Sequence, residues 1–130
     1  MNWELKGLGV FALCPISLRG PIFHAIECKK GRGVILPGGK WEPGEQYHAT
    51  AVREIGEEMG LRVTNPRFFH FGANADGYLC YTFQVDLTNH FQTPIETDEG
   101  RPCEATWDDL IQGSAFGPYM AVLADLWRRH

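Results

Sequence analysis

The sequence predicts an α/β fold in which a mixed β-sheet lies between helices. Strand-like alternation occupies much of residues 7–36 and 61–87, and apolar residues at helical spacing occupy 46–59 between them. A second helical pattern follows at 116–129. Because 130 residues is the length of one ordinary domain, we expect residues 1–130 to form a single domain.

The first third of the chain contains three short strand patterns. Residues 7–14 form an apolar run that ends at Pro15, and residues 21–28 alternate between two faces. A third strand at 34–36 ends at Pro37-Gly38-Gly39, since proline and glycine interrupt regular structure. The turns expected between these strands lie at 17–20 and 29–33.

The clearest helix spans residues 46–59. Four apolar residues recur at steps of three and four and are expected to form its buried face: Ala49, Val52, Ile55 and Met59. Gly60 follows the last of them, and glycine is common just past the C-terminus of a helix. We therefore expect the helix to end there.

Strand patterns resume at 61–63, 67–73 and 78–87, with a hairpin turn at 74–77. The second pattern places Phe69 and Phe71 on the face opposite Phe68 and His70. In the third pattern, one face is apolar and is expected to line the core: Leu79, Tyr81, Phe83, Val85 and Leu87.

The C-terminal part of the sequence predicts a loop, a strand and two helical segments. Residues 88–101 are polar and acidic, as in a long loop, and 103–107 have the pattern of a short strand. Asp108 is a candidate N-cap for a brief helical turn, and Ser114 for the last helix at 116–129. The expected core face of that helix consists of Met120, Leu123, Ala124 and Trp127.

Composition argues against several classes of protein. The net charge of −4 disfavours attraction to phosphate backbones, so we do not expect nucleic acid as a general partner. The sequence contains no apolar run of the roughly 18 residues that a membrane span needs, and its N-terminus does not resemble a signal peptide. The cysteines form no C-x-x-C pair, which favours free thiols in a reducing cytoplasm: Cys14, Cys28, Cys80 and Cys103.

Acidic residues concentrate on one side of the helix at 46–59. Glu54, Glu57 and Glu58 are spaced so that they occupy neighbouring positions, where like charges repel. A hard cation such as Mg²⁺ offsets this repulsion, because it binds carboxylate oxygens and links them to substrate phosphates. The alternative is an ordinary solvated acidic face with one internal ion pair to Arg53.

The whole segment has the pattern Gly39-x5-Glu45-x7-Arg53-Glu54-Ile55-x-Glu57-Glu58-x-Gly60-Leu61. This pattern resembles the signature box of the Nudix hydrolases at every fixed position. Chance agreement at seven fixed residues is on the order of 10⁻⁹ per starting point. The flanking sequences Leu36-Pro37-Gly38-Gly39-Lys40 and Glu104-x-x-Trp107-x-x-Leu110 are also similar to the family.

The resemblance implies a Nudix-type α/β/α sandwich with a central mixed sheet, in which the box forms a loop, a helix and a loop. It also implies a Mg²⁺-dependent pyrophosphohydrolase, with Mn²⁺ as a possible substitute, that acts on a nucleoside diphosphate linked to another group. Carried over to this sequence, Glu54, Glu57 and Glu58 are expected to bind metal, with one of them as general base. Arg53 is expected to orient these glutamates, and the Gly38 carbonyl to join the metal shell. Supporting roles fall to Gly39, Glu45 and Gly60.

The family often recruits one more acidic residue, for which Glu99 and Glu104 are the candidates here, each also explained as a surface glutamate. A nucleoside triphosphate is the favoured substrate. The alternatives are a dinucleoside polyphosphate hydrolase, a catalytically silent nucleotide-binding module and an RNA-end-processing module. Candidate substrate-binding residues are Phe11, His24 and Tyr78, for which core packing or an unremarkable surface position is the alternative. The oligomeric state is expected to be a monomer or a homodimer.

Overall fold

The computed structural model describes residues 8–17, 21–29, 31–73 and 78–129. The turn expected at 74–77 lies outside the described residues, as does most of the one expected at 17–20. The elements in chain order are β1 (Leu8–Leu13), β2 (Pro15–Ser17), β3 (Ile22–Cys28), β4 (Gly33–Ile35), β5 (Gly38–Lys40), α1 (Tyr47–Met59), β6 (Val63–Ala73), β7 (Leu79–Leu87), β8 (Gly100–Thr106), α2 (Trp107–Gly113) and α3 (Gly117–Arg128).

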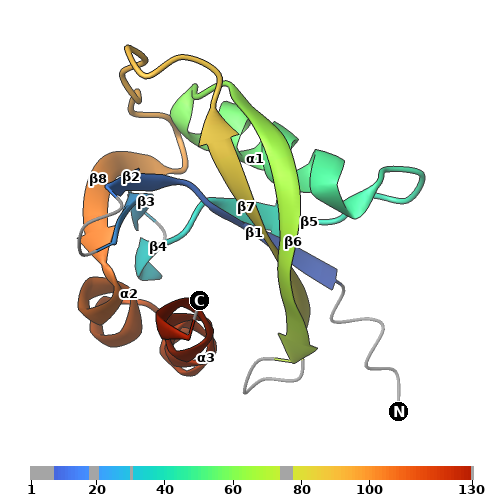
Figure 1. Cartoon of the computed structure of the whole chain (residues 1–130). Helices are drawn as coiled ribbons and strands as arrows, with labels where there is room; N and C mark the ends of the chain where they lie inside the picture. Colours follow the sequence, from blue (N-terminus) through green and yellow to red (C-terminus); the bar gives the residue numbers. More distant parts are fainter. Residues whose placement is uncertain (1–7, 18–20, 30, 74–77, 130) are drawn as a thin grey trace.

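The strands form two sheets (Figure 1). The chain passes from one sheet to the other where β1 is followed directly by β2. The larger sheet has the order β5-β1-β7-β6, in which β1 runs parallel to β7 and the other neighbours are antiparallel. In the smaller sheet, β3 pairs with β2 and β4, and also with β8 along its whole length. The mixed sheet that the sequence predicts is therefore confirmed.

Helices cover the sheets from opposite sides, with α1 on one side and α2 and α3 on the other (Figure 1). Each side has its own buried cluster. Ile55 and Met59 of α1 pack among residues such as Val10 and Val85, whereas Leu110 of α2 and Leu123 of α3 belong to the second cluster. The expected α/β/α arrangement follows, because each apolar helix face is buried against the strands between them.

Helix α1 begins within one residue of the expected start and ends as expected. Gly60 adopts φ 68°, the left-handed conformation that glycine accepts at a helix end, and its N–H donates to the Gly56 carbonyl at 2.9 Å. Ile55 and Met59 are fully buried, but Ala49 and Val52 are only half-buried. The buried face instead includes Thr50, Ala51 and Glu58. Compared with the expected face, the buried face of α1 is therefore turned toward Glu58.

Strand β6 is longer and less regular than the sequence indicates. The two patterns at 61–63 and 67–73 merge into one strand, with irregularities at Thr64–Arg67 and Phe68–His70. A β-bulge adds one residue and thereby changes which side chains share a face. Phe68 and Phe71 both contact Tyr81, whereas Phe69 contacts Trp127 on the other side. The expectation that Phe69 and Phe71 share a face is wrong.

Strand β7 is buried on both faces rather than one. Phe83 and Val85 are buried as expected, but Cys80 and Thr82 from the opposite face are buried too, at 3% and 0% exposure. The reason is the position of β7 inside the larger sheet, between α1 on one side and α3 on the other. A central strand of a covered sheet has no solvent face.

The C-terminal elements differ from expectation mainly at their starts. Strand β8 begins at Gly100, three residues before the predicted strand. The N-cap of α2 is Thr106 rather than Asp108. The Thr106 hydroxyl accepts from the Asp109 N–H at 3.2 Å, and the Asp109 carboxylate accepts from the Thr106 N–H at 2.9 Å. Helix α3 starts after Phe116, whose N–H donates to the Ser114 hydroxyl at 2.9 Å.

In the described part of the chain, none of the helices has both the length and the apolar character required to cross a membrane.

Candidate active site

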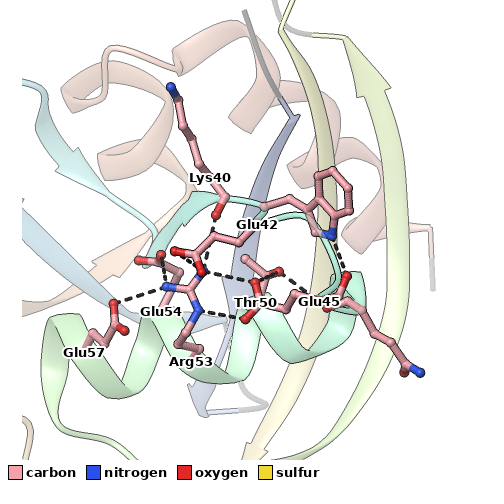
Figure 2. Close-up of polar contacts among 9 residues, drawn as sticks. Lys40, Glu42, Glu45, Thr50, Arg53, Glu54 and Glu57 are labelled. Carbon is pink, nitrogen blue, oxygen red and sulfur yellow. Dashed lines mark hydrogen bonds and ion pairs between the residues drawn. The ribbon is translucent and has the colours of Figure 1, made fainter. Parts of the chain in front are cut away.

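The acidic residues of the box gather where β5 leads through a short loop into α1. Strand β5 pairs antiparallel with β1, so the loop starts from a fixed position at the edge of the larger sheet. Figure 2 shows Glu45, Glu54 and Glu57 around the guanidinium group of Arg53. The loop and the helix thus bring together residues that lie up to 12 positions apart.

Arg53 holds this arrangement with most of its donors. Its Nε and Nη2 donate to the two carboxylate oxygens of Glu45 at 2.8 and 3.1 Å. Its Nη1 donates to Glu54 at 2.8 Å and to Glu57 at 3.3 Å, and Nη2 also reaches the Lys40 carbonyl at 3.3 Å. This planar fork matches carboxylate geometry, which a lysine ammonium does not reproduce. Arg53 thus contacts Glu45, Glu54 and Glu57 at the same time.

The hydrogen bonds from Arg53 are the main cause that lowers the pKa of Glu45 to about 2, and a bond from Thr50 adds to the effect. The Thr50 hydroxyl donates to Glu45 at 2.6 Å, and Thr50 itself is completely buried. Sequence reasoning missed Thr50. The available signal was its place on α1, three residues before Arg53 and four before Glu54, which puts it on the same side of the helix.

Glu58 is the most buried acidic residue of the site. It is 5% exposed, and its Oε1 accepts a hydrogen bond of 2.7 Å from the backbone N–H of Gly38. Burial is the main cause that raises its pKa to about 8, against the opposing effect of the Gly38 bond. The charges of Glu54 and Glu99 raise the pKa further. Without a cation, this carboxyl group is therefore largely protonated near neutral pH.

Glu54 interacts with Glu58, because both its charge and its side chain contribute to the raised pKa of Glu58. The side chain of Glu54 is 14% exposed, and burial raises its pKa as well. A Cβ atom added at Gly39 would lie 2.5 and 2.6 Å from the carboxylate oxygens of Glu54, so any other residue there would push that carboxylate away from its present place. The glycine at position 39 is therefore needed to make room for the Glu54–Glu58 pair.

The Glu54–Glu58 pair fits a hard divalent cation. The two adjacent carboxyl groups, buried at Glu58 and half-buried at Glu54, have raised pKa values and offer the oxygen ligands that Mg²⁺ prefers. A cation offsets both their burial and their mutual repulsion. Glu57 is arranged differently, because its side chain is 59% exposed and turns to Arg53. Accordingly, no three acidic, histidine or cysteine side chains among the described residues surround one common point.

The two candidates for an additional acid lie in different places. The Thr97 hydroxyl donates to the Glu58 carbonyl at 2.9 Å and accepts from the Glu99 N–H at 3.2 Å, so the backbone of Glu99 lies close to that of Glu58. The charge of Glu99 raises the pKa of both Glu54 and Glu58. Glu104 instead lies opposite His24 in the pairing of β3 with β8, and lines a pocket together with residues of α2. The structure therefore brings Glu99, and not Glu104, to the carboxylate pair.

The candidate substrate-binding residues are spread over the fold. Phe11 is buried and packs against Phe116 and Tyr119, with ring centroids 5.4 and 5.8 Å apart. His24 is also buried, and its Nδ1 has no hydrogen-bond partner within the described ranges. Tyr78 is 39% exposed just before β7. Of the three, Phe11 lies next to the acidic site, because it pairs with Gly38, whose N–H binds Glu58. His24 lies on β3 of the other sheet.

Comparison with known families identifies the fold. The model of the NUDIX domain matches residues 18–120. The chain belongs to the NUDIX family. Membership confirms the resemblance in the box and makes the chain a hydrolase of pyrophosphate bonds in small nucleotide substrates, in a family that generally uses divalent metals.

Solved structures support the same NUDIX fold. A C. elegans Ap4A hydrolase has a TM-score of 0.73 at 13% identity, with 93% of this chain and 96% of that chain covered. A MutT structure from Aliivibrio salmonicida or Vibrio cholerae has a TM-score of 0.72 at 19% identity, covering 95% and 97%. A NUDIX hydrolase from Nitrosomonas europaea has a TM-score of 0.71 at 21% identity, covering 95% and 88%. At these identities the likeness shows the fold. The comparison with curated proteins gave no significant match.

Proposed function

We propose that the chain is a Mg²⁺-dependent nucleoside triphosphate pyrophosphohydrolase. The observation that carries this proposal is the Glu54–Glu58 pair on α1, the helix of the box. Gly39 leaves space for the Glu54 carboxylate beside Glu58. The choice of a nucleoside triphosphate rests on analogy with short members of the family. Mn²⁺ has the same preference for oxygen ligands and is the expected substitute.

Glu54 and Glu58 would hold the metal, with Glu57, Glu99 and the Gly38 carbonyl as additional ligands. A bound Mg²⁺ supplies charge neutralisation of the diphosphate and a water of lowered pKa. Glu58 must give up its proton for this role, since its burial favours the neutral form when no cation is bound. We propose that the general base comes from the same group of glutamates.

Arg53 would act through the glutamates. It binds Glu45 of the loop and Glu54 and Glu57 of the helix at once, so it fixes the position of the loop relative to the helix. Orientation of this kind accounts for a large share of catalysis in phosphoryl transfer, where little covalent chemistry falls to the protein. Glu45, with its pKa of about 2, stays ionised and anchors Arg53 across the accessible pH range.

A dinucleoside polyphosphate is the second candidate substrate. Tyr78 is 39% exposed just before β7, and aromatic rings can stack on a base. The fold is also similar to that of the C. elegans Ap4A hydrolase. A silent binding module is disfavoured because the three box glutamates are all present. RNA-end processing would require a basic channel, but Lys29 pairs with Glu96 and Arg129 with Asp125.

We also propose that residues 1–130 act as one domain, as a monomer or homodimer in the cytoplasm. All four cysteines are free thiols, and Cys14 and Cys80 are buried. Burial raises the pKa of Cys14 to about 12 and that of Cys80 to about 11, so neither thiol is readily ionised. This chemistry suits a reducing compartment.

A substrate panel tests the proposal. Release of phosphate and pyrophosphate is measured for nucleoside triphosphates, Ap4A, ADP-ribose and a capped RNA, each with Mg²⁺, with Mn²⁺ and with EDTA. We expect metal-dependent turnover, fastest with a nucleoside triphosphate. Faster turnover of Ap4A favours the second candidate, and no turnover of any nucleotide by the metal-loaded protein contradicts both.

A further inference from the structure

The loop between β7 and β8 closes onto the C-terminal end of α1. The last carbonyls of a helix have no partner within the helix and must find one elsewhere. Here the Ile95 N–H donates to the Met59 carbonyl and the Thr97 hydroxyl donates to the Glu58 carbonyl, each at 2.9 Å. A Cβ atom added at Gly60 would come within 2.8 Å of Ile95, which shows how closely the loop approaches. The loop therefore caps the helix that carries the box.

The Thr97 hydroxyl makes two hydrogen bonds at this junction. It donates to the Glu58 carbonyl at 2.9 Å and accepts from the Glu99 N–H at 3.2 Å. A single hydroxyl group can make both bonds, because it has one donor hydrogen and two acceptor lone pairs. Thr97 thus joins the backbone of Glu58 to the backbone of Glu99. Both residues are among the acids whose charges interact at the site, together with Glu54 and Glu57.

Other bonds hold the turn that contains Thr97, but they use its backbone. Thr97 and Gly100 exchange backbone hydrogen bonds of 3.1 and 3.2 Å. Lys29 donates from its backbone N–H to the Glu99 carbonyl and from Nζ to the Thr97 carbonyl, both at 3.2 Å. Loss of the hydroxyl would therefore leave the turn attached to β3 and loosen its attachment to α1.

We propose that Thr97 is a positioning residue, whose hydroxyl sets the place of the Glu99 carboxylate relative to the Glu54–Glu58 pair. The inference rests on the proposed function, because the place of Glu99 matters only if these acids act together. Thr97 itself does not touch the substrate in this account. It acts through Glu99, which it ties to the last turn of α1.

Three variants test this role, with kcat and KM measured for Mg²⁺-dependent nucleoside triphosphate hydrolysis. Thr97→Val keeps the shape of the side chain but removes the hydroxyl, and we expect kcat to fall roughly 10- to 100-fold, as for small displacements of catalytic groups, with KM little changed. Thr97→Ser keeps the hydroxyl and should restore most of the rate. Thr93→Val is the matched control in the same loop, at an exposed threonine, and should behave as wild type. Equal rates in Thr97→Val and Thr93→Val overturn the inference.

A double-mutant cycle with Glu99→Gln separates positioning from simple stabilisation. If Thr97 acts through Glu99, the double variant Thr97→Val/Glu99→Gln should have nearly the same kcat as Glu99→Gln alone, because the two changes remove the same interaction. If Thr97 only stabilises the fold, its cost should be the same in both backgrounds, which overturns the inference. A Glu99→Gln variant with wild-type kcat overturns it as well.

Folding is checked by circular dichroism and thermal melting of each variant. Should Thr97→Val fail to fold, the pair Thr97→Ala and Thr97→Ser makes the same comparison with a smaller side chain. Failure of the proposed function appears differently, as a wild-type protein that hydrolyses no nucleotide, and overturns both proposals. An active wild type with an unaffected Thr97→Val variant overturns only the role of Thr97.

Discussion

The buried carboxyl group of Glu58 accepts a 2.7 Å hydrogen bond from the backbone N–H of Gly38. One residue belongs to the last turn of α1 and the other to β5, so this bond joins the two ends of the site. It also favours the ionised form of a carboxyl group that burial drives toward the neutral form. The site is therefore prepared for a negative charge that burial alone would suppress.

The stability of the metal-free protein should depend on the ionisation of Glu58. The pKa of Glu58 rises from 4.5 to about 8 on folding, so the folded state holds the proton more tightly. Stability is then lost as pH rises through the window between these two values. We expect the melting temperature in EDTA to fall across this window, and to fall less in Glu58→Gln, whose side chain cannot ionise.

Asp108→Asn is the control for this experiment, because Asp108 is exposed in the first turn of α2 and away from the pair. It should keep the wild-type dependence on pH. An identical slope in wild type and Glu58→Gln would show that burial does not perturb Glu58 as described.

Mg²⁺ should stabilise the folded protein through the carboxylate pair. A ligand that binds only the folded state at a hundred times its Kd adds about 2.7 kcal/mol to stability. We expect a rise in melting temperature with Mg²⁺ in wild type and a smaller rise in Glu54→Gln. Because Glu58 must lose its proton, binding near pH 7 should also release protons, which calorimetry in buffers of different ionisation enthalpy measures. A melting temperature indifferent to Mg²⁺ would count against the metal site.

Replacement of Gly39 by alanine should damage activity more than stability. The added Cβ would meet the carboxylate of Glu54, which has to move away from Glu58. We expect kcat to fall by roughly 100-fold, as for other displaced catalytic groups. Gly56→Ala is the matched control on α1, because a Cβ there meets only the Leu61 carbonyl at 3.7 Å. It should keep activity and add about 0.5–1 kcal/mol of stability, since alanine favours helix. Similar activity in the two variants would contradict the packing described for Gly39.

Arg53→Lys tests whether the geometry of the guanidinium group matters beyond its charge. Lysine cannot bind both oxygens of Glu45 and also reach Glu54, so the loop should no longer be held in place against the helix. We expect kcat to fall roughly 10- to 100-fold. Arg67→Lys, at the exposed ion pair with Asp86, changes the same residue type away from the site and should leave kcat unaltered. If both lysine variants keep full activity, Arg53 has no orienting role.

The helix and the acidic site were predictable because their determinants are local. Apolar spacing places Ile55 and Met59 on the core side of α1, and Gly60 ends the helix in the conformation that glycine favours. The same helical spacing places Arg53 beside Glu54 and Glu57. What spacing could not show is the difference in burial, which leaves Glu57 exposed and encloses Glu58. That difference comes from β5, which donates to Glu58 from outside the helix.

The strands were predicted only in part. No strand was expected at β2 (Pro15–Ser17) or at β5 (Gly38–Lys40), where the sequence indicates a break, and the patterns at 61–63 and 67–73 form the single strand β6. The bulge near Phe68 in β6 changes the alternation, and a pattern of apolar residues does not reveal it. Thr97 and Glu99 lie in a segment with no periodicity, and their place at the end of α1 depends on tertiary contacts such as that of Ile95 with Met59. Sequence reasoning could name Glu99 as an acid but had no means to prefer it over Glu104 by position.

The most direct test of the account is the rate of nucleoside triphosphate hydrolysis at saturating Mg²⁺ by Glu58→Gln beside wild type. Glutamine keeps the size of the side chain and can still accept the bond from Gly38, so the fold should persist in a thermal melt. We expect kcat to fall by roughly 1,000-fold or more, since the variant lacks a charged ligand that the metal-bound site requires. A folded Glu58→Gln protein with a rate close to that of wild type would contradict the claim that the Glu54–Glu58 pair is the catalytic metal site.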